Sequence, residues 1–104
     1  MTQITVRLGH MKPFRLSAHA VRRSVQRGAS EQEIAHVLAT ATRETADRGL
    51  WRAHGTFSSP TRSPVNGTMY NQKAVEIIFA DEPDGITVVT VKVYYADREA
   101  QDED

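Results

Sequence analysis

The spacing of hydrophobic residues changes along this chain, and each change predicts a different element of secondary structure. Residues 4–8 alternate apolar and polar side chains, which is typical of a short strand. Residues 18–27 and 31–44 carry apolar residues at helical spacing. Strand-like runs follow at residues 50–57, 74–80 and 86–95. We therefore expect an α+β fold in which an N-terminal strand and two helices pack on a mainly antiparallel sheet of three to four strands.

The helix predicted at residues 18–27 has a start signal and a stop signal. Ser17 can cap its first turn by accepting from a backbone N–H, and Gly28 can adopt the left-handed conformation that ends a helix. Helical periodicity then divides the side chains between two faces. The face expected to pack contains Ala18, Val21 and Val25, and the opposite face contains His19, Arg22, Arg23, Gln26 and Arg27. One short helix thus combines a packing surface with a histidine among three arginines.

The second helix, at residues 31–44, is expected to be structural. Ser30 and Glu33 form a capping box, in which each side chain accepts from the other residue's backbone N–H. Its apolar face consists of Ile34, Val37, Leu38 and Ala41. Residues 14–16, which precede the first helix, are expected only to lead into that helix and pack against it.

The last strands are joined by recognisable turns. The polar segment 58–67 contains two prolines and ends in Asn-Gly, which predicts a loop closing into a hairpin. The acidic segment 81–85 should join the final two strands as an antiparallel pair. In the last strand, side-chain alternation predicts that Val89, Val91 and Val93 face the core, whereas Thr90, Lys92 and Tyr94 share the accessible side.

Composition indicates an ordinary soluble domain. The chain has 104 residues, of which 39% are hydrophobic and 25% charged; we expect a single domain at residues 1–95 and a flexible acidic tail at 96–104. It has no cysteine, which excludes disulfides and thiolate chemistry. No segment resembles a signal peptide or a membrane span, so a cytoplasmic location is expected.

The net charge of zero hides an uneven distribution. Residues 1–80 contain eleven Lys/Arg and five Asp/Glu, whereas residues 81–104 contain two and eight. A basic body with an acidic end suits a polyanionic partner such as nucleic acid. The alternative is a solvated surface on which the two signs happen to be segregated.

The first helix and the last strand resemble a known bacterial family. His19-Ala20-x-x-Arg23-x-x-x-Arg27-Gly28 is followed by Ser30 and a Glu-rich helix start, and the final strand contains Val89-Thr90-Val91. Over residues 14–95 this pattern resembles the bacterial domain of unknown function 4258. That family is similar in fold to the RelE/ParE toxins and to the barnase, EndoU, colicin and RelE group of small metal-independent ribonucleases. The resemblance implies a RelE/barnase-like fold.

The resemblance also implies RNA cleavage without a metal or other cofactor, by attack of a ribose 2′-hydroxyl on the adjacent phosphate. This chemistry needs a base for the hydroxyl proton, cations for the charge on the phosphate, and an acid, left unassigned here, for the leaving oxygen. The implied catalytic residues are His19, Arg23, Arg27 and Thr90, with His19 as the base. The implied nucleic-acid contacts are Arg22, Lys73, Lys92 and Tyr94. An active toxin of this kind would also need a neutralising antitoxin or immunity protein.

Other interpretations of these residues remain open. A non-catalytic module could bind nucleic acid or a protein partner with the same basic face, and that face is also compatible with a solvated helix. Thr90 suits a strand without any catalytic reason. The four histidines, His10, His19, His36 and His54, include no pair at the short helical spacing of a zinc site, and no Gly-rich phosphate loop precedes a helix. We therefore expect neither a metal site nor a nucleotide cofactor.

Overall fold

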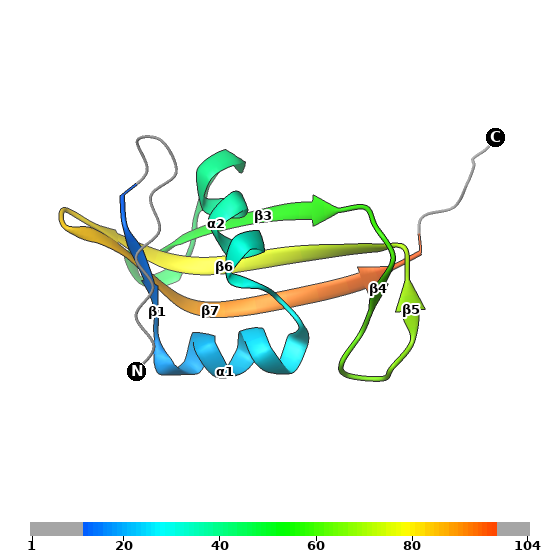
Figure 1. The fold of residues 1–104 in the computed structure, drawn as a ribbon. Coiled ribbons are helices and arrows are strands. Elements are labelled where there is room, and N and C mark those ends of the chain that lie inside the picture. Colours follow the sequence, from blue (N-terminus) through cyan, green and yellow to red (C-terminus); the bar gives the residue numbers. More distant parts are fainter. Residues whose placement is uncertain (1–11, 98–104) are drawn as a thin grey trace.

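A computed structural model describes residues 12–97, which form two helices and two sheets (Figure 1). In chain order the elements are β1 (Phe14–Leu16), α1 (Ala18–Arg27), α2 (Glu31–Thr40), β2 (Glu44–Thr45), the 3₁₀ turn η1 (Asp47–Gly49), β3 (Trp51–Phe57), β4 (Thr61–Arg62), β5 (Met69–Tyr70), β6 (Gln72–Glu82) and β7 (Gly85–Ala96). The main sheet has the order β1-β7-β6-β3-β2, and β4 pairs with β5 in a small second sheet. The α+β class is confirmed, but the main sheet is mixed and has five strands rather than three or four. The predicted strand at 4–8 and residues 98–104 of the predicted tail lie outside the described residues. The first two residues of that tail are not flexible, contrary to the expectation, since Ala96 ends β7 and Asp97 Oδ1 accepts from the Asn71 N–H at 3.0 Å.

Strand β1 is a correction to the sequence-based expectation. Its residues were expected only to lead into the first helix, but they pair in parallel with β7, placing Phe14 opposite Ile86 and Leu16 opposite Val88. Phe14 and Leu16 are each 2% exposed. A strand of three residues is too short to show a period, and its partner lies near the other end of the chain. Long-range pairing therefore decides the conformation of this segment.

Helix α2 covers one face of the main sheet, across β3 and β6 (Figure 1). The predicted capping box is present: Ser30 Oγ accepts from the Glu33 N–H at 3.1 Å, and the Glu33 carboxylate accepts from the Ser30 N–H at 2.9 Å. The helix ends at Thr40 rather than at residue 44, because Ala41 is already extended and the chain then pairs with β3 as β2. The core between this helix and the sheet includes Ile34, Val37, Ala53, Val75, Ile77 and Phe79.

Helix α1 has the predicted ends, but only part of the predicted face packs. Ser17 Oγ accepts from the Ala20 N–H, and Gly28 ends the helix at φ 87°. Val21 packs against the core as expected, beside the buried Ala20 and Ser24. Ala18 and Val25, also expected to pack, are exposed, Val25 to 73%. The buried Ser24 hydroxyl donates to the Val21 carbonyl at 2.8 Å, so its burial leaves no unpaired donor. Small side chains on this face let α1 lie close beside β7, as Figure 1 shows.

A β-bulge in β7 changes which side chains face the core. Ile78 pairs with Thr90 and Phe79 with Val88, so Val89 is an extra residue in β7. Val88 and Val91 are buried, but Val89 is only half-buried, and its predicted core position is wrong. Ser17 is anchored to this irregular segment: its N–H donates to the Val88 carbonyl at 2.9 Å and its hydroxyl to the Val89 carbonyl at 3.1 Å. The bulge thus fixes the start of α1 against β7.

The end of α1 is held by the segment that was predicted to close into a hairpin. In that segment β4 pairs with β5, which follows the segment, and the Ser63 N–H donates to the Thr68 carbonyl at 2.9 Å. A Cβ on Gly28 would overlap the Tyr95 hydroxyl and lie 3.0 Å from Pro64 Cδ. Glycine is therefore required at this helix end both by its positive φ and by the close approach of the hairpin.

Candidate functional site

A cleft of about 340 Å³ lies between α1 and the neighbouring part of β7. Its lining consists of His19, Arg23 and Arg27 from the helix, and Thr90, Val91, Lys92, Val93 and Tyr94 from the strand. All four predicted catalytic residues and two of the predicted nucleic-acid contacts therefore border one cavity. None of its lining residues is acidic.

Helical periodicity explains why the three α1 residues meet in the cleft. His19, Arg23 and Arg27 follow one another at intervals of four, so they project from the same side of the helix. Ser17 anchors this helix to the bulge of β7, and Thr90 lies immediately after the bulge. His19 Nε2 is consequently 3.1 Å from Thr90 Oγ1, a hydrogen bond whose donor is either group according to the imidazole tautomer.

The two arginines of the cleft carry most of its positive charge. Arg23 Nη1 donates to Gln26 Oε1 over 3.5 Å, a long contact. Among residues 12–97, neither the Arg23 nor the Arg27 guanidinium forms an ion pair. Forked guanidinium groups at helical spacing can each donate two hydrogen bonds to the oxygens of one phosphate. The cleft can therefore bind an anion.

Lys92 and Tyr94 extend the cleft onto the face of the sheet that α2 does not cover. Lys92 is exposed and stands opposite Glu76 in the pairing of β6 with β7. Tyr94 is 56% exposed, and its hydroxyl donates to Glu76 Oε1 at 3.3 Å. The sequence analysis did not identify Glu76 as the hydrogen-bond acceptor of the Tyr94 hydroxyl. Its alternation with the buried Val75 and Ile77 was the available signal, because it placed Glu76 on the same sheet face as Tyr94.

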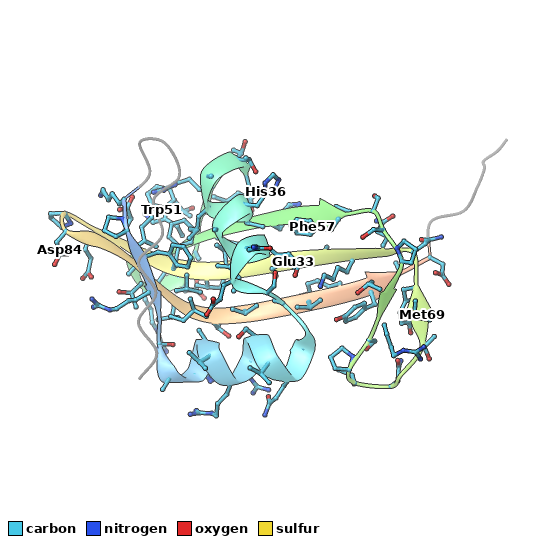
Figure 2. The ribbon with its side chains drawn as sticks, viewed as in Figure 1. Glu33, His36, Trp51, Phe57, Met69 and Asp84 are labelled. Atoms are coloured by element: carbon cyan, nitrogen blue, oxygen red, sulfur yellow. The ribbon has the colours of Figure 1, made fainter. Side chains whose placement is uncertain are left out.

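Two predicted nucleic-acid contacts do not line the cleft. Lys73 is only 8% exposed; its ammonium donates to the Gly28 carbonyl at 2.6 Å and pairs with Glu33 at 2.9 Å. Figure 2 shows Glu33 on α2, on the sheet face that this helix covers. Arg22 is exposed on α1 but outside the cleft. Lys73 therefore links the end of α1 to the start of α2, and its charge is already neutralised.

Tyr95 also holds α1, the helix that borders the cleft, through a hydrogen bond at its last turn. Its hydroxyl donates to the Arg27 carbonyl at 2.6 Å, next to the point where Lys73 contacts Gly28. Burial, and to a smaller extent the negative charge of Glu33, raise the pKa of Tyr95 above its ordinary value of 10.0. The tyrosine is thus a neutral donor near pH 7 and holds the last turn of α1 against the sheet.

Comparison with known proteins gives no match, either to a family model, to a curated protein or to a solved structure. In residues 12–97 no three His, Cys, Asp or Glu side chains are grouped so that they could hold a metal ion. Neither of the two helices described for this chain is long and apolar enough to cross a membrane. The site is therefore described by its geometry alone. His19 and three cations, Arg23, Arg27 and Lys92, line an open cleft between α1 and β7.

Proposed function

We propose that this chain is a small metal-independent ribonuclease of the toxin-like type, related to the bacterial domain of unknown function 4258. The observation that carries the proposal is the contact of His19 Nε2 with Thr90 Oγ1, at 3.1 Å, inside a cleft whose charged residues are all basic. An imidazole next to cationic donors suits a reaction that removes a proton beside a phosphate and increases negative charge on it.

In the proposed reaction, the His19 Nε2–H donates to Thr90 Oγ1, and His19 Nδ1 takes the proton of a ribose 2′-hydroxyl. The 2′ oxygen forms a bond to the adjacent phosphorus as the bond from phosphorus to the 5′ oxygen breaks. The leaving 5′ oxygen takes a proton from a water molecule in the open cleft, and the resulting hydroxide takes the proton from His19, which becomes neutral again. The products are a 2′,3′-cyclic phosphate and a 5′-hydroxyl. Thr90, in contact with the imidazole, orients the ring toward the 2′-hydroxyl.

Arg23 and Arg27 stabilise the phosphate as its charge increases. Their guanidinium groups enter the cleft from successive turns of α1 and have no ion-pair partner within the described part of the chain. Lys92 contributes a third positive charge from the strand. Donors already in place around the phosphate stabilise the transition state without rearrangement of the protein, which is why such groups contribute strongly to catalysis.

The proposal includes a partner. A cationic cleft that cleaves RNA would be neutralised by an antitoxin or immunity protein with an acidic surface, which would bind the same arginines. A cytoplasmic location belongs to the same proposal, because RNA and such a partner would meet the protein there.

A second candidate function is binding of nucleic acid without turnover. One observation favours it: His19 is the single imidazole, and no carboxylate is present, among the residues lining the cleft. A ribonuclease with one proton-transferring side chain must use water for the other transfer, whereas a binding module needs neither. The arginines, Lys92 and the exposed ring of Tyr94 would suffice to hold a single strand by charge and stacking.

The first experiment incubates a labelled mixed RNA pool with the purified protein in EDTA. The ribonuclease proposal predicts cleavage to 2′,3′-cyclic phosphate ends, loss of cleavage in His19→Ala, and retention in His36→Ala, which removes an exposed imidazole from α2. Circular dichroism confirms that each variant is folded. Wild-type-like cleavage by folded His19→Ala would contradict the proposed role of the histidine.

Binding measured at several salt concentrations separates the two functions. Arg23→Ala, inside the cleft, should weaken RNA binding more than Arg22→Ala, which removes the same charge from the same helix outside the cleft. Binding that depends on salt and on Arg23, without cleavage in the wild type, would establish the binding module. Equal effects of the two arginines would show that the cleft is not the binding site.

A further inference from the structure

A second cavity lies on the open face of the sheet and shares a wall with the cleft. It has a volume of about 350 Å³ and is lined by η1, by Leu50 and Arg52, by Ile78 of β6 and by Lys92 of β7. Lys92 also lines the cleft that contains His19. The two cavities are therefore neighbours on either side of one lysine.

The strand register places the second cavity at a definite distance from the catalytic pair. Thr90 is paired with Ile78, and Ile78 with Arg52, so the three residues form a row across β7, β6 and β3. With strands ~4.8 Å apart, the row extends about 10 Å from Thr90 to Arg52. A strand of RNA bound at Thr90 can therefore reach this cavity across the open face of the sheet.

The second cavity combines an apolar floor with charged walls. Ile78 and Leu50 provide apolar surface, while Arg48, Arg52 and Lys92 provide positive charge. Within residues 12–97, Arg48 and Lys92 form no ion pair, and Arg52 lies 3.8 Å from both Glu44 and Glu76 with its Nε buried and without a hydrogen bond. Asp47, also in the lining, can accept from the amino group of a base. Such a combination suits a nucleotide, which has a flat apolar ring, polar ring edges and a phosphate.

The backbone conformation of Arg48 also distinguishes this cavity. Arg48 has φ 63° and ψ 33°, and among the non-glycine residues of the described chain it is the one with a positive φ. The conformation is held by hydrogen bonds from the Ala46 N–H to the Leu50 carbonyl at 2.8 Å and from the Leu50 N–H to the Asp47 carbonyl at 3.2 Å. A left-handed arginine costs about 1 kcal/mol or more relative to glycine, and such residues cluster at functional sites.

We propose that this cavity is a subsite for a further nucleotide, next to the two that the phosphate at His19 joins. The inference rests on the proposed binding of RNA in the cleft. The base of the flanking nucleotide lies against Ile78 and Leu50, its phosphate is contacted by Arg48 and Lys92, and Asp47 selects bases that carry an amino group. The minimum RNA that this protein binds well is then longer than the cleft alone requires.

The test uses Arg48→Gly, which removes the guanidinium and replaces it with the residue that tolerates a positive φ. Affinities are measured by fluorescence anisotropy for a dinucleotide and for an RNA of about eight nucleotides, both with a 2′-O-methyl group at each position to prevent cleavage. We expect Arg48→Gly to be as stable as the wild type, to bind the longer strand about tenfold more weakly, and to bind the dinucleotide with unchanged affinity. Arg22→Ala, which removes a charge outside both cavities, is the control and should not discriminate by length.

The outcomes separate this proposal from the one on which it rests. Equal loss of affinity for both lengths, or no loss for either, would overturn the subsite while leaving RNA binding in the cleft intact. Failure of the wild type to bind either strand at low salt would overturn the RNA-binding proposal and the subsite together. Nuclear magnetic resonance with adenosine monophosphate gives an independent readout: shifts at the Ile78 methyl groups that are lost in Arg48→Gly support the subsite, and their absence contradicts it.

Discussion

The two faces of the main sheet each carry a lysine, and the two lysines have different surroundings: Lys73 lies on the face covered by α2 and Lys92 on the open face. Lys73 is buried in line with Val75 and Ile77 on the face covered by α2, and its ammonium is paired with Glu33 and the Gly28 carbonyl. Lys92 is exposed on the open face and has no ion-pair partner in the described chain. A buried charge has to be paired to be tolerated, whereas an exposed one stays available to a ligand. Lys73 therefore stabilises the fold, whereas Lys92 is free to contact a bound anion.

The largest expected effect is on stability, and it distinguishes the two lysines. Lys73→Met leaves the Glu33 carboxylate and the end of α1 without their buried partner, and should lower the free energy of unfolding by about 2–3 kcal/mol. Lys92→Met removes an exposed unpaired charge and should change it by less than about 0.5 kcal/mol. Urea unfolding of both variants measures the difference. RNA affinity should show the reverse order when measured on folded protein, and equal destabilisation by both substitutions would contradict this division of roles.

A smaller effect is expected on the covered side at Tyr95. Tyr95→Phe removes the hydrogen bond to the Arg27 carbonyl and should cost about 1 kcal/mol near pH 7. Because the pKa of Tyr95 is raised above 10.0 in the folded protein, its stabilising effect is fully present below pH 10 and is lost as pH rises through the higher folded value. The stability difference between wild type and Tyr95→Phe should therefore narrow in strongly alkaline solution. A difference that is constant from pH 7 to pH 11 would contradict the raised pKa, and the absence of any difference at pH 7 would contradict a role for the hydroxyl.

A surface ion-pair network at the end of the sheet gives the smallest effect among the paired groups considered. Asp81 accepts from Lys12 Nζ at 2.7 Å and from Arg43 Nη1 at 2.6 Å. These hydrogen bonds, first to Lys12 and then to Arg43, hold the pKa of Asp81 below its ordinary value of 3.8. Its contribution is present above pH 3.8 and is lost as pH falls through the lower folded value.

Asp81→Asn should cost up to about 1 kcal/mol at pH 7, with the difference from wild type shrinking in acid. Thermal unfolding at pH 7 and near pH 3 measures both values. The acidic turn that contains this residue lies at the far end of β6 and β7 from the β4–β5 hairpin, as the positions of Asp84 and Met69 in Figure 2 show. The substitution should leave RNA binding unchanged, and a large change in affinity would show that the charge of this turn reaches the cleft.

Local chemistry was enough to predict much of the fold. The ends of α1 and the start of α2 depend on Ser17, Gly28, Ser30 and Glu33, which act on backbone groups within a few residues. Intervals of four along α1 likewise predicted that His19, Arg23 and Arg27 share a side. Alternation along β7 predicted a common face for Lys92 and Tyr94, which both border the cleft.

Tertiary structure decided what depends on residues distant in sequence. The parallel pairing made β1 a strand, and the bulge at Val89 reset the alternation of β7 and brought Thr90 to His19. Close packing of α1 exposed Val25, although its local pattern predicted burial. None of these three features has a signal in the residues concerned, because each depends on which strand or helix lies alongside.

The sequence by itself determined which side chains could carry the chemistry and on which element each would stand, because caps, helical spacing and strand alternation act over a few residues. Only the folded chain decided which of those side chains meet. In the folded chain Lys73 forms a buried ion pair, Lys92 lines two cavities, and Arg48 lines one of them. The physical reason is that burial and proximity depend on the contacts between elements, and one sequence does not display those contacts.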